Sequence, residues 1–554
     1  MGSPLTWRAI TIRRRCIERV GVAHRGPGLP RVSNSLACHD FPSLPQRAAP
    51  RMTARCVMVL GTSSGAGKSW LATALCRWYA RQGLRVAPFK AQNMSNNARV
   101  VALPDRAPGA DAGSGGGEIG SAQYFQALAA RARPEVRHNP LLLKPERDTH
   151  SQVVLLGRVS AELTALPWRG RSERVWPVLA QALDTLRAEN DVVVIEGAGS
   201  PAEINLMASD IVNLRVARHA GARCLLVADI DRGGAFAHLY GTWALLSEAD
   251  RALLRGFVLN KFRGDVALLA PAPAQLEALT GVPTVATLPM WRGHGLPEED
   301  GMFDERGHGP GNGQGTVLRT VAVVAYPRIS NLDEFQPLKN IPGLRLAWAR
   351  EAADLASLAV SDWVVLPGSK HTSGDLAWLR AQGLDGAIAA HAARGGAVLG
   401  VCGGLQMLGE ALIDPHGIDG NAPGLGLLPL VTLFEPDKTV RHRSARFGAL
   451  AGGAWVALSG LALDGYEIHH GQTAEHPAMA AAGQRARAVM ADGLAWQNDA
   501  GNVLGLYLHG LFESPRALQA LFGAHAPTLD SVFDGLADRI DAHFAPGVLR
   551  SLIE

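Results

Sequence analysis

Short apolar runs alternate with helical stretches along most of the chain. The first half contains five such runs, at residues 57–60, 86–89, 192–195, 224–228 and 257–259. A second series follows, with runs at residues 321–325, 363–366 and 397–401. Continuous apolar runs separated by helices are typical of parallel strands in a sheet that is covered on both faces. We therefore predict an α/β fold with two tandem domains, each built on a parallel sheet.

Breaks in this pattern predict the domain boundaries. The stretch 292–315, dense in Gly, His and acids, separates the two series and is the expected linker, and 107–117 is an expected surface loop. The first 51 residues are rich in Arg and Pro, which favours a disordered extension upstream of a start at Met52 over a transit peptide. The predicted extension, first domain, linker, second domain and helical tail span residues 1–51, 52–291, 292–316, 317–525 and 526–554.

The charge distribution and the cysteines exclude several classes of protein. The net charge is +4, but residues 1–51 contain nine Arg and two acids, so the remaining 503 residues carry −3. Such a body has no electrostatic preference for nucleic acid, and no run of 18 apolar residues indicates a membrane span. The six Cys lack metal-ligand spacing, which favours a reducing compartment such as the cytoplasm, with any reactive Cys acting alone.

A glycine-rich segment directly follows the first apolar run and opens a helical stretch. Its sequence is GTSSGAGKS, at residues 61–69. In a phosphate loop the backbone N–H groups bind phosphate, a lysine neutralises it, and a hydroxyl holds Mg²⁺. The spacing of the outer glycines is one residue longer than in the standard loop, but the Gly-Lys-Ser core is intact. The segment predicts an ATP site formed by Gly61, Thr62, Ser63, Gly65, Gly67, Lys68 and Ser69.

Several polar residues follow other apolar runs of the first domain. Glu196 ends the run at 192–195, and beside a phosphate loop a carboxylate at a strand end is well placed to hold Mg²⁺ together with Ser69. Asp229 and Asp231 are weaker candidates for the same role. We therefore predict Ser69 and Glu196 as the metal ligands.

Two further segments are expected at this edge of the sheet. Asn260 and Lys261 follow the run at 257–259 and are candidates to contact the nucleotide. Lys90, Gln92 and Asn93 lie in PFKAQNMSNN after the run at 86–89. Because α/β proteins bind ligands at this edge, these three residues are candidates to bind phosphate or substrate carboxylates.

In the second domain, Cys402 lies between an apolar run and a helical stretch. The sequence AVLGVCGGLQML is typical of a nucleophile elbow, in which the helix N-terminus lowers the pKa of the thiol. The backbone N–H groups that follow can stabilise an oxyanion, so Gly403 is one predicted donor. Gly368, at another strand-to-turn junction (LPGSK), is the other.

A nucleophilic Cys needs a base, and three histidines are candidates. His509 ends the apolar run LGLYL and is followed by Gly, which leaves its ring exposed at a strand end. His469 and His470, in YEIHHG, are the alternatives. We predict His509 as the partner of Cys402.

These motifs and their order resemble the cobyric acid synthases over about residues 53–520. The resemblance is carried by GTSSGAGKS, PFKAQNMSNN, NPLLLKPERDTHSQVVL, VADIDRGGAF, NKFRGD, LPGSKHTSGDLAWLR and CGGLQMLG. It implies an ATP-using domain similar to dethiobiotin synthetase, fused to a flavodoxin-like class I glutamine amidotransferase domain. The implied nucleophile is Cys402 and the implied general base and acid is His509. Many class I members carry Glu two residues after the His, whereas this chain has Leu511, so no third member of the site is assigned.

The resemblance also implies a reaction in cobalamin biosynthesis. Four peripheral carboxylates of adenosylcobyrinic acid a,c-diamide become amides, each at the expense of one ATP and one glutamine. The implied cofactors are ATP and Mg²⁺, and the implied partners are L-glutamine and a corrinoid polycarboxylate; the oligomeric state is left open. Since ammonia is mostly ammonium at neutral pH, a protected passage between the domains is expected.

Two other readings are consistent with parts of the sequence. A related amidotransferase could act on another polycarboxylate, such as the earlier a,c-diamide substrate or a cell-wall precursor, although PFKAQNMSNN argues against it. A partitioning or regulatory ATPase could instead keep an inactive amidotransferase-like module.

Overall fold

The computed structural model describes residues 54–103, 115–147, 149–297, 317–524 and 527–554. The predicted extension at 1–51 lies outside the described residues, as do most of the predicted loop at 107–117 and most of the predicted linker at 292–316. Within the described ranges, no helix combines the length and the apolar character that crossing a membrane requires.

The first domain is built on a six-stranded sheet in which every neighbouring pair is parallel. Its strands, in sheet order, are β12 (Thr284–Pro289), β11 (Leu254–Phe262), β10 (Arg223–Asp229), β1 (Arg55–Gly61), β9 (Val192–Glu196) and β2 (Val86–Phe89). The strands are almost wholly buried, which explains their continuous apolar runs. Parallel pairing brings the carboxyl ends of β1, β9 and β10 to one edge.

Helices flank this sheet. They are α1 (Lys68–Arg81), α2 (Ser121–Ala129), α3 (Ala161–Ala165), α4 (Trp168–Glu189), α5 (Leu214–Ala220), α6 (Ala235–Leu245), α7 (Glu248–Arg251) and α8 (Ala272–Thr280), with the 3-10 turns η1 (Val136–His138), η2 (Met207–Ser209) and η3 (Val266–Leu269). Two small sheets join them: β3 (Gln92–Met94), β6 (Leu141–Arg147), β7 (His150–Leu155) and β8 (Arg158–Val159) in one, β4 (Ala98–Val101) and β5 (Gly117–Gly120) in the other.

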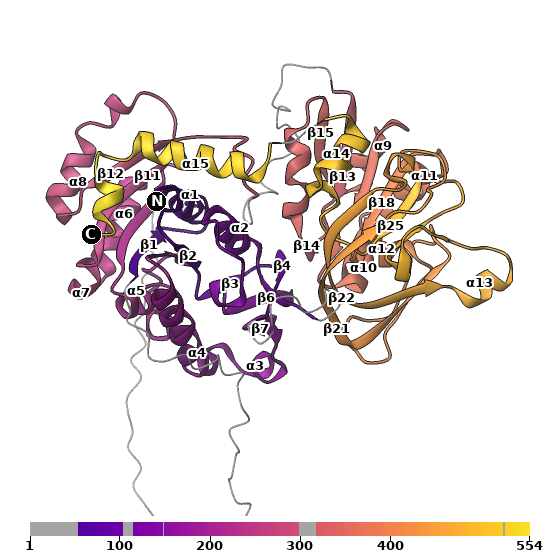
Figure 1. The fold of residues 1–554 in the computed structure, drawn as a ribbon, viewed down its shortest axis with the longest axis horizontal. Helices are drawn as coiled ribbons and strands as arrows, with labels where there is room; N and C mark the ends of the chain where they lie inside the picture. Colours follow the sequence, from indigo (N-terminus) through magenta and orange to yellow (C-terminus); the bar gives the residue numbers. More distant parts are fainter. Residues whose placement is uncertain (1–53, 104–114, 148, 298–316, 525–526) are drawn as a thin grey trace, which may run out of the picture. The chain divides into compact units, whose positions relative to one another are not determined.

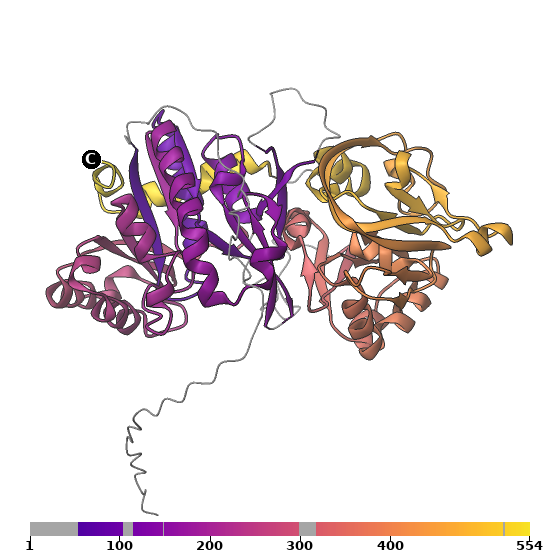
Figure 2. The ribbon, with the colours of Figure 1, turned by 90° about the horizontal axis from the view of Figure 1, so that it is seen from below.

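The C-terminal segment packs on the first domain although it follows the second in sequence. It forms α15 (Leu529–His543) and α16 (Val548–Ser551). Phe533 and Leu536 of α15 share a buried apolar cluster with Leu75 of α1. In Figure 1 and Figure 2 the yellow C-terminal segment accordingly runs over the indigo and purple first domain. The predicted helical tail is therefore part of the first domain's core.

The second domain has a seven-stranded sheet. In sheet order its strands are β15 (Leu344–Ala349), β13 (Arg319–Val324), β16 (Trp363–Leu366), β18 (Ala397–Val401), β25 (Val503–Leu506), β24 (Ala495–Gln497) and β23 (Arg487–Ala488). The first five strands are parallel to one another, whereas β24 is antiparallel to both of its neighbours, β25 and β23. The helices of this domain are α9 (Ala352–Ala356), α10 (Thr372–Ala381), α11 (Leu384–Ala393), α12 (Gly403–Leu408), α13 (Pro477–Ala481) and α14 (Pro515–Phe522).

A long antiparallel hairpin and several short elements complete this domain. The hairpin is β21 (Leu430–Arg446) with β22 (Ala462–Glu475), extended by β19 (Ala411–Ile413) and β20 (Ala422–Pro423). The short pair β14 (Ile329–Ser330) and β17 (Gly368–Ser369) is antiparallel. The 3-10 turns are η4 (Leu332–Asn340), η5 (Val456–Leu458), η6 (Ala491–Gly493) and η7 (Leu511–Glu513).

The two domains share a small apolar core. Ala98 and Val100 of β4 are clustered with Tyr466 and Ile468 of β22. The prediction of an α/β fold with two tandem domains, each containing a parallel sheet, is thus confirmed.

Candidate functional site

The phosphate loop lies between β1 and α1. Gly65 and Gly67 have φ values of 74° and 101°, in the left-handed region that favours glycine. Lys68 is buried, and its ammonium donates hydrogen bonds to the carbonyl oxygens of Ser63 at 2.9 Å and Gly199 at 3.2 Å. The ammonium of Lys68 therefore lies between the loop and the segment after β9, where it is placed to neutralise a bound phosphate.

Glu196, at the end of β9, is the centre of a buried polar network beside this loop. It accepts hydrogen bonds from Ser69 Oγ at 2.7 Å, Lys90 Nζ at 2.8 Å and Gln126 Nε2 at 2.5 Å. Burial alone would raise the pKa of Glu196, but Lys90 above all, with Ser69 and Gln126, outweighs it and lowers the pKa. The two predicted metal ligands, Ser69 and Glu196, are thus in direct contact.

The predicted substrate residues lie near this network. Lys90, which follows β2, reaches Glu196 directly. Gln92 is buried, and among the described residues its side-chain Oε1 has no hydrogen-bond partner. Asn93 donates to Gln123 Oε1 at 3.2 Å. Thr62 Oγ1, in the phosphate loop, also has no partner in the described ranges. Unpartnered polar atoms that are closed off from water are expected where a ligand supplies the missing contacts.

Asn260 and Lys261 lie under the phosphate loop. Asn260 Nδ2 donates to the Ala66 carbonyl at 2.9 Å, and Lys261 Nζ donates to the Gly65 carbonyl at 2.8 Å. Lys261 also pairs with Asp229, at 3.1 Å. The two side chains thus hold the backbone of the phosphate loop in place, a role that the sequence did not predict. Contact of the two residues with a nucleotide stays a prediction.

The two alternative metal ligands have other partners. Asp229 pairs with Lys261, and Asp231 pairs with Arg263. Ser69 Oγ instead donates its hydrogen bond to Glu196, at 2.7 Å. The geometry therefore favours Glu196 as the acid beside the Gly-Lys-Ser core.

Cys402 occupies a strained turn between β18 and α12. Its φ of 51° and ψ of −106° are unusual for a residue other than glycine. The turn is tightly packed, since a Cβ atom on Gly403 would lie 2.7 Å from Ser369 N and one on Gly404 would lie 1.9 Å from Leu366 O. This is the geometry of a nucleophile elbow.

His509 lies beside Cys402 because β18 and β25 are parallel neighbours. The ring is buried, so the expectation that it would be exposed at the strand end is wrong. Its Nδ1 lies 3.1 Å from Glu334 Oε1. Burial favours the neutral ring, but Glu334 first, and then a hydrogen bond with Cys402, raise the pKa of His509 to about 10. The imidazolium form therefore persists beside the Cys402 sulfur at neutral pH.

Glu334 is a residue of the candidate site that sequence reasoning missed. It belongs to η4, 175 positions before His509, and it also accepts a hydrogen bond from the Gly510 N–H at 3.3 Å. Leu511, at the place where many class I members carry Glu, is fully buried in the core. In the sequence, the only indication of this role was that Glu334 is an acid in the segment that follows β13, the first strand of the second domain.

The predicted oxyanion donors lie around the same two residues. Gly403 directly follows Cys402 and packs on Ser369. A Cβ atom on Gly368 would lie 3.1 Å from His509 Cε1. The structure thus brings the backbone of both glycines close to the Cys402–His509 pair.

The two alternative histidines have other partners. His469 bonds Glu467 Oε2 at 3.0 Å and the Gly471 carbonyl at 2.8 Å. His470 bonds the Glu435 carbonyl, and burial, aided by Lys438, lowers its pKa to about 4. His509 is the histidine whose pKa depends on Cys402.

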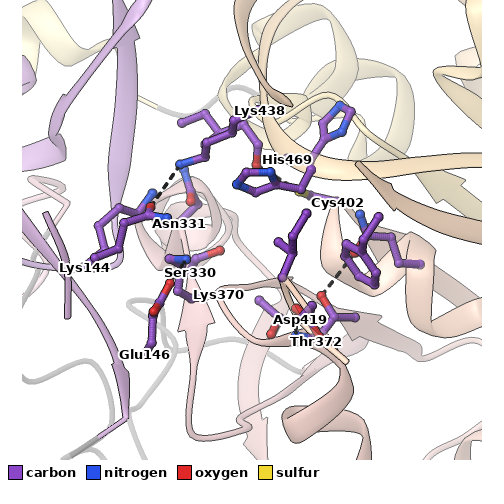
Figure 3. A pocket seen from close by; sticks show the side chains of 17 residues that line it. Lys144, Glu146, Ser330, Asn331, Lys370, Thr372, Cys402, Asp419, Lys438 and His469 are labelled. Atoms are coloured by element: carbon purple, nitrogen blue, oxygen red, sulfur yellow. Dashed lines mark hydrogen bonds and ion pairs between the residues drawn. The ribbon is translucent and has the colours of Figure 1, made fainter. Parts of the chain in front are cut away.

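A cavity of about 80 Å³ contains Cys402 in its lining. Residues of both domains line it: Lys144, Glu146, Gln152, Ser330, Asn331, Ser369, Lys370, Thr372, Cys402, Gln406, Ile418, Asp419, Phe434, Lys438, Ile468, His469 and His470. Figure 3 shows Lys144 and Glu146 on the purple ribbon of the first domain and Cys402 and Thr372 on the ribbons of the second.

Ion pairs join the domains at this cavity, and those of Glu118 are the more deeply buried. Glu118 of the first domain accepts from Lys144 at 2.8 Å and from Lys438 of β21 at 2.5 Å, and Glu146 accepts from Lys370 at 2.6 Å. Because one carboxylate is shared by two ammonium groups, Glu118 stays ionised and one cation is in excess. Burial first, and then Lys144 and Lys370, lower the pKa of Lys438 to about 7. Lys438 belongs to none of the motifs identified in the sequence.

Two family models match the chain, one for each domain. The CobQ/CobB/MinD/ParA nucleotide binding domain matches residues 57–293, and the CobB/CobQ-like glutamine amidotransferase domain matches residues 320–517. Together with the phosphate loop and the Cys402–His509 pair, these matches define the class of protein: it is a glutamine-dependent amidotransferase that uses ATP.

Relatives with high identity make the assignment more specific. The chain is 80% identical over 502 residues to a cobyric acid synthase of Variovorax paradoxus (strain S110), covering 91% of this chain and 100% of the relative. It is 73% identical over 502 residues to that of Polaromonas naphthalenivorans (strain CJ2), with the same coverage. It is 66% identical over 510 residues to that of Leptothrix cholodnii (strain ATCC 51168 / LMG 8142 / SP-6), covering 91% and 98%. The chain belongs to the cobyric acid synthase family, as its motifs predicted.

Proposed function

We propose that this protein amidates four peripheral carboxylates of adenosylcobyrinic acid a,c-diamide, giving cobyric acid in cobalamin synthesis. Each amide consumes one ATP and one glutamine. The observation that carries the proposal is the buried Cys402–His509–Glu334 arrangement in the same chain as a phosphate loop. Identity to relatives named cobyric acid synthase over 91% of the chain supports the substrate.

In the second domain, glutamine is hydrolysed through a thioester. The Cys402 thiolate attacks the amide carbon, and the N–H groups of Gly403 and Gly368 stabilise the oxyanion that forms. His509, held protonated by Glu334, gives its proton to the nitrogen as ammonia leaves. His509 then takes a proton from water, the resulting hydroxide attacks the thioester, and glutamate departs with the Cys402 sulfur restored.

In the first domain, ATP activates the acceptor carboxylate. A carboxylate is a poor electrophile, because oxide is a poor leaving group. Attack of a carboxylate oxygen on the terminal phosphorus of ATP releases ADP and forms an acyl phosphate. Ammonia then displaces phosphate to give the amide. Lys68 and Lys90 lie at this site and would neutralise the transferring charge. Gln92 Oε1, which has no hydrogen-bond partner within the part of the chain that the structure describes, would bind the substrate.

Ser69 and Glu196 would hold Mg²⁺ at this site. A hydroxyl and one carboxylate in contact suit a Mg²⁺ ion, which takes oxygen ligands and completes its shell with phosphate and water. The ion would neutralise charge on the phosphates. The proximity of Lys90 to the same carboxylate leaves Glu196 ionised and ready to coordinate.

Ammonia has to travel from Cys402 to the acyl phosphate without escaping as ammonium. The cavity that holds Cys402 is lined by residues of both domains, which supports a protected start to this path.

The test separates the two halves of the reaction. We expect Cys402→Ala to abolish glutamine-driven amidation, because the nucleophile is gone, while added ammonia still drives it. Amides are counted by mass after incubation with cobyrinic a,c-diamide, ATP and Mg²⁺. Cys224→Ala, at a buried cysteine of β10, is the matched control and should retain both activities. Loss of both activities in Cys402→Ala alone, or no added amide in the unmodified protein, would contradict the proposal.

A further inference from the structure

The guanidinium of Arg99, in the first domain, binds two carboxylates of the second domain. Arg99 lies on β4 and is buried. Its Nε donates to Asp333 Oδ2 at 2.9 Å, and Nη2 donates to the same oxygen. Its Nη1 and Nη2 donate to the two carboxylate oxygens of Glu513, at 2.8 Å and 2.5 Å. One planar guanidinium thus holds two carboxylates of the other domain in a fixed orientation.

Both carboxylates lie next to the residues that carry the glutamine chemistry. Asp333 directly precedes Glu334 in η4. Glu513 ends η7, the turn that follows His509 and Gly510. Arg99 therefore fixes the two backbone segments from which Glu334 and His509 extend.

Aromatic rings also contact the Arg99 guanidinium. The Arg99 guanidinium lies 5.2 Å from the ring centre of Tyr466 and 4.9 Å from that of Phe125. Tyr466 in turn stacks on His509, with ring centres 5.2 Å apart and planes inclined by 20°. Arg99 thus supports the His509 ring from a third direction.

The neighbours of Arg99 hold the start of η4 as well. Asn97 Oδ1 accepts from the Leu332 N–H at 2.9 Å, and the Ala98 carbonyl accepts from Asn331 Nδ2 at 2.8 Å. Asn331 has a φ of 56°, in the left-handed region that asparagine tolerates, and its side chain is fixed by this contact with the first domain. The segment that carries Glu334 is therefore shaped by the first domain, not only by its own.

We propose that Arg99 is a positioning residue for glutamine hydrolysis: the first domain uses it to set the relative orientation of Glu334 and His509. This inference rests on the function proposed above. Without Arg99, the Asp333 carboxylate would be left in a site closed to water, where an unpaired charge is unfavourable, and the η4 segment would shift to relieve it. A shift of about 1 Å at a catalytic group can cost roughly 100-fold in rate.

The test compares Arg99→Met with Arg77→Met in the full chain. Arg77 is an equally buried arginine that binds two carboxylates, Asp530 and Asp534, in the first domain. For Arg99→Met we expect kcat for glutamine hydrolysis to fall about 10- to 100-fold, with KM for glutamine changed less than about threefold and ammonia-driven amidation retained. Arg77→Met should keep the ratio of glutamine- to ammonia-driven activity, and Arg99→Lys should restore part of the lost kcat.

Each outcome decides between the proposals. If the unmodified protein hydrolyses no glutamine, the proposed function fails. If it does, but Arg99→Met leaves kcat unchanged or lowers both activities in parallel as a general loss of stability would, only the inference about Arg99 is overturned. If Arg99→Met does not fold, Glu513→Gln tests the same ion pair at a carboxylate that is partly exposed. That variant should lower kcat for glutamine hydrolysis without affecting the ammonia reaction.

Discussion

At the scale of single residues, the pairing of His509 with Glu334 shows how a buried ring can stay protonated beside a thiol. Removing an imidazole from water favours its neutral form, yet a carboxylate 3.1 Å from Nδ1 reverses that preference. The carboxylate also selects the orientation in which the other ring nitrogen faces Cys402. A leucine occupies the position where sequence comparison would seek the acid, so the same chemical need is met from a different element.

Glu334→Gln should slow glutamine hydrolysis by about 100-fold or more, because the amide neither stabilises the imidazolium nor enforces its orientation. The pKa of His509 should fall from about 10 toward its ordinary value. The activity of the variant should therefore decline at a lower pH than that of the unmodified protein. Initial rates of glutamate release across pH 6 to 10.5 measure both effects.

The same substitution should change stability with a definite pH dependence. A histidine whose pKa is raised in the folded state stabilises the fold fully below its unfolded pKa of about 6.5 and loses this contribution as pH rises through about 10. The stability difference between the two proteins should thus be largest near pH 6, about 3 kcal/mol for a broken buried pair, and should shrink as the pH rises from about 6.5 to about 10. Glu277→Gln, at an exposed acid of α8, is the control in urea unfolding and should show no such trend.

At the scale of elements, the turn between β1 and α1 shows why glycine is required at one place in the phosphate loop. Gly67 has a φ of 101°, and a Cβ atom there would lie 2.0 Å from Asn260 Nδ2. The side chains of Asn260 and Lys261 donate hydrogen bonds to two backbone carbonyls of the loop, so the loop cannot move away from Asn260 without breaking them. The extra residue relative to the standard spacing is accommodated while Lys68 still points back into the loop.

Gly67→Ala should raise the Kd for ATP at least about tenfold, because the methyl group displaces either the loop or its brace at Asn260. Gly83→Ala is the matched control: Gly83 has a φ of 81°, but nothing lies within 4 Å of the added Cβ. That control should cost about 1 kcal/mol of stability and leave the Kd unchanged. Calorimetric titration with a non-hydrolysable ATP analogue gives both constants; equal affinities for the two variants would refute the steric explanation.

At the scale of the whole molecule, the last helix returns to the first domain after the chain has completed the second. Val532, Phe533 and Leu536 of α15 join the apolar cluster around α1. Arg77, buried in α1, binds Asp530 and Asp534 on the same helix. The helix that follows the phosphate loop is therefore held in place by the end of the chain.

Phe533→Ala should destabilise the first domain by about 3–5 kcal/mol, the range for removing a buried Phe side chain. Because α15 packs on α1, the temperature at which ATP binding is lost should fall, and ammonia-driven amidation should be lost with it. Ser531→Ala, at an exposed position of the same helix, is the control. Identical inactivation temperatures for both variants would mean that α15 contributes nothing to the ATP-binding domain.

The sequence by itself determined the features that depend on contiguous residues. The apolar runs specified the buried parallel strands, GTSSGAGKS specified the phosphate loop, and the strand–Cys–Gly–Gly–helix order specified the elbow at Cys402. Each of these follows from local backbone sterics or from burial of one short segment, so spacing alone is informative.

Only the tertiary structure decided which distant side chains meet. It brought Glu334 to His509 across 175 positions, Arg99 to Glu513 across 414 positions, Lys438 to Glu118 across 320 positions, and α15 to α1. The residues around each of these side chains form no recognisable motif. A sequence does not distinguish an acid or an arginine that faces water from one that faces a buried partner. Their roles follow from burial and from the charge that each one faces, and these are properties of the folded chain.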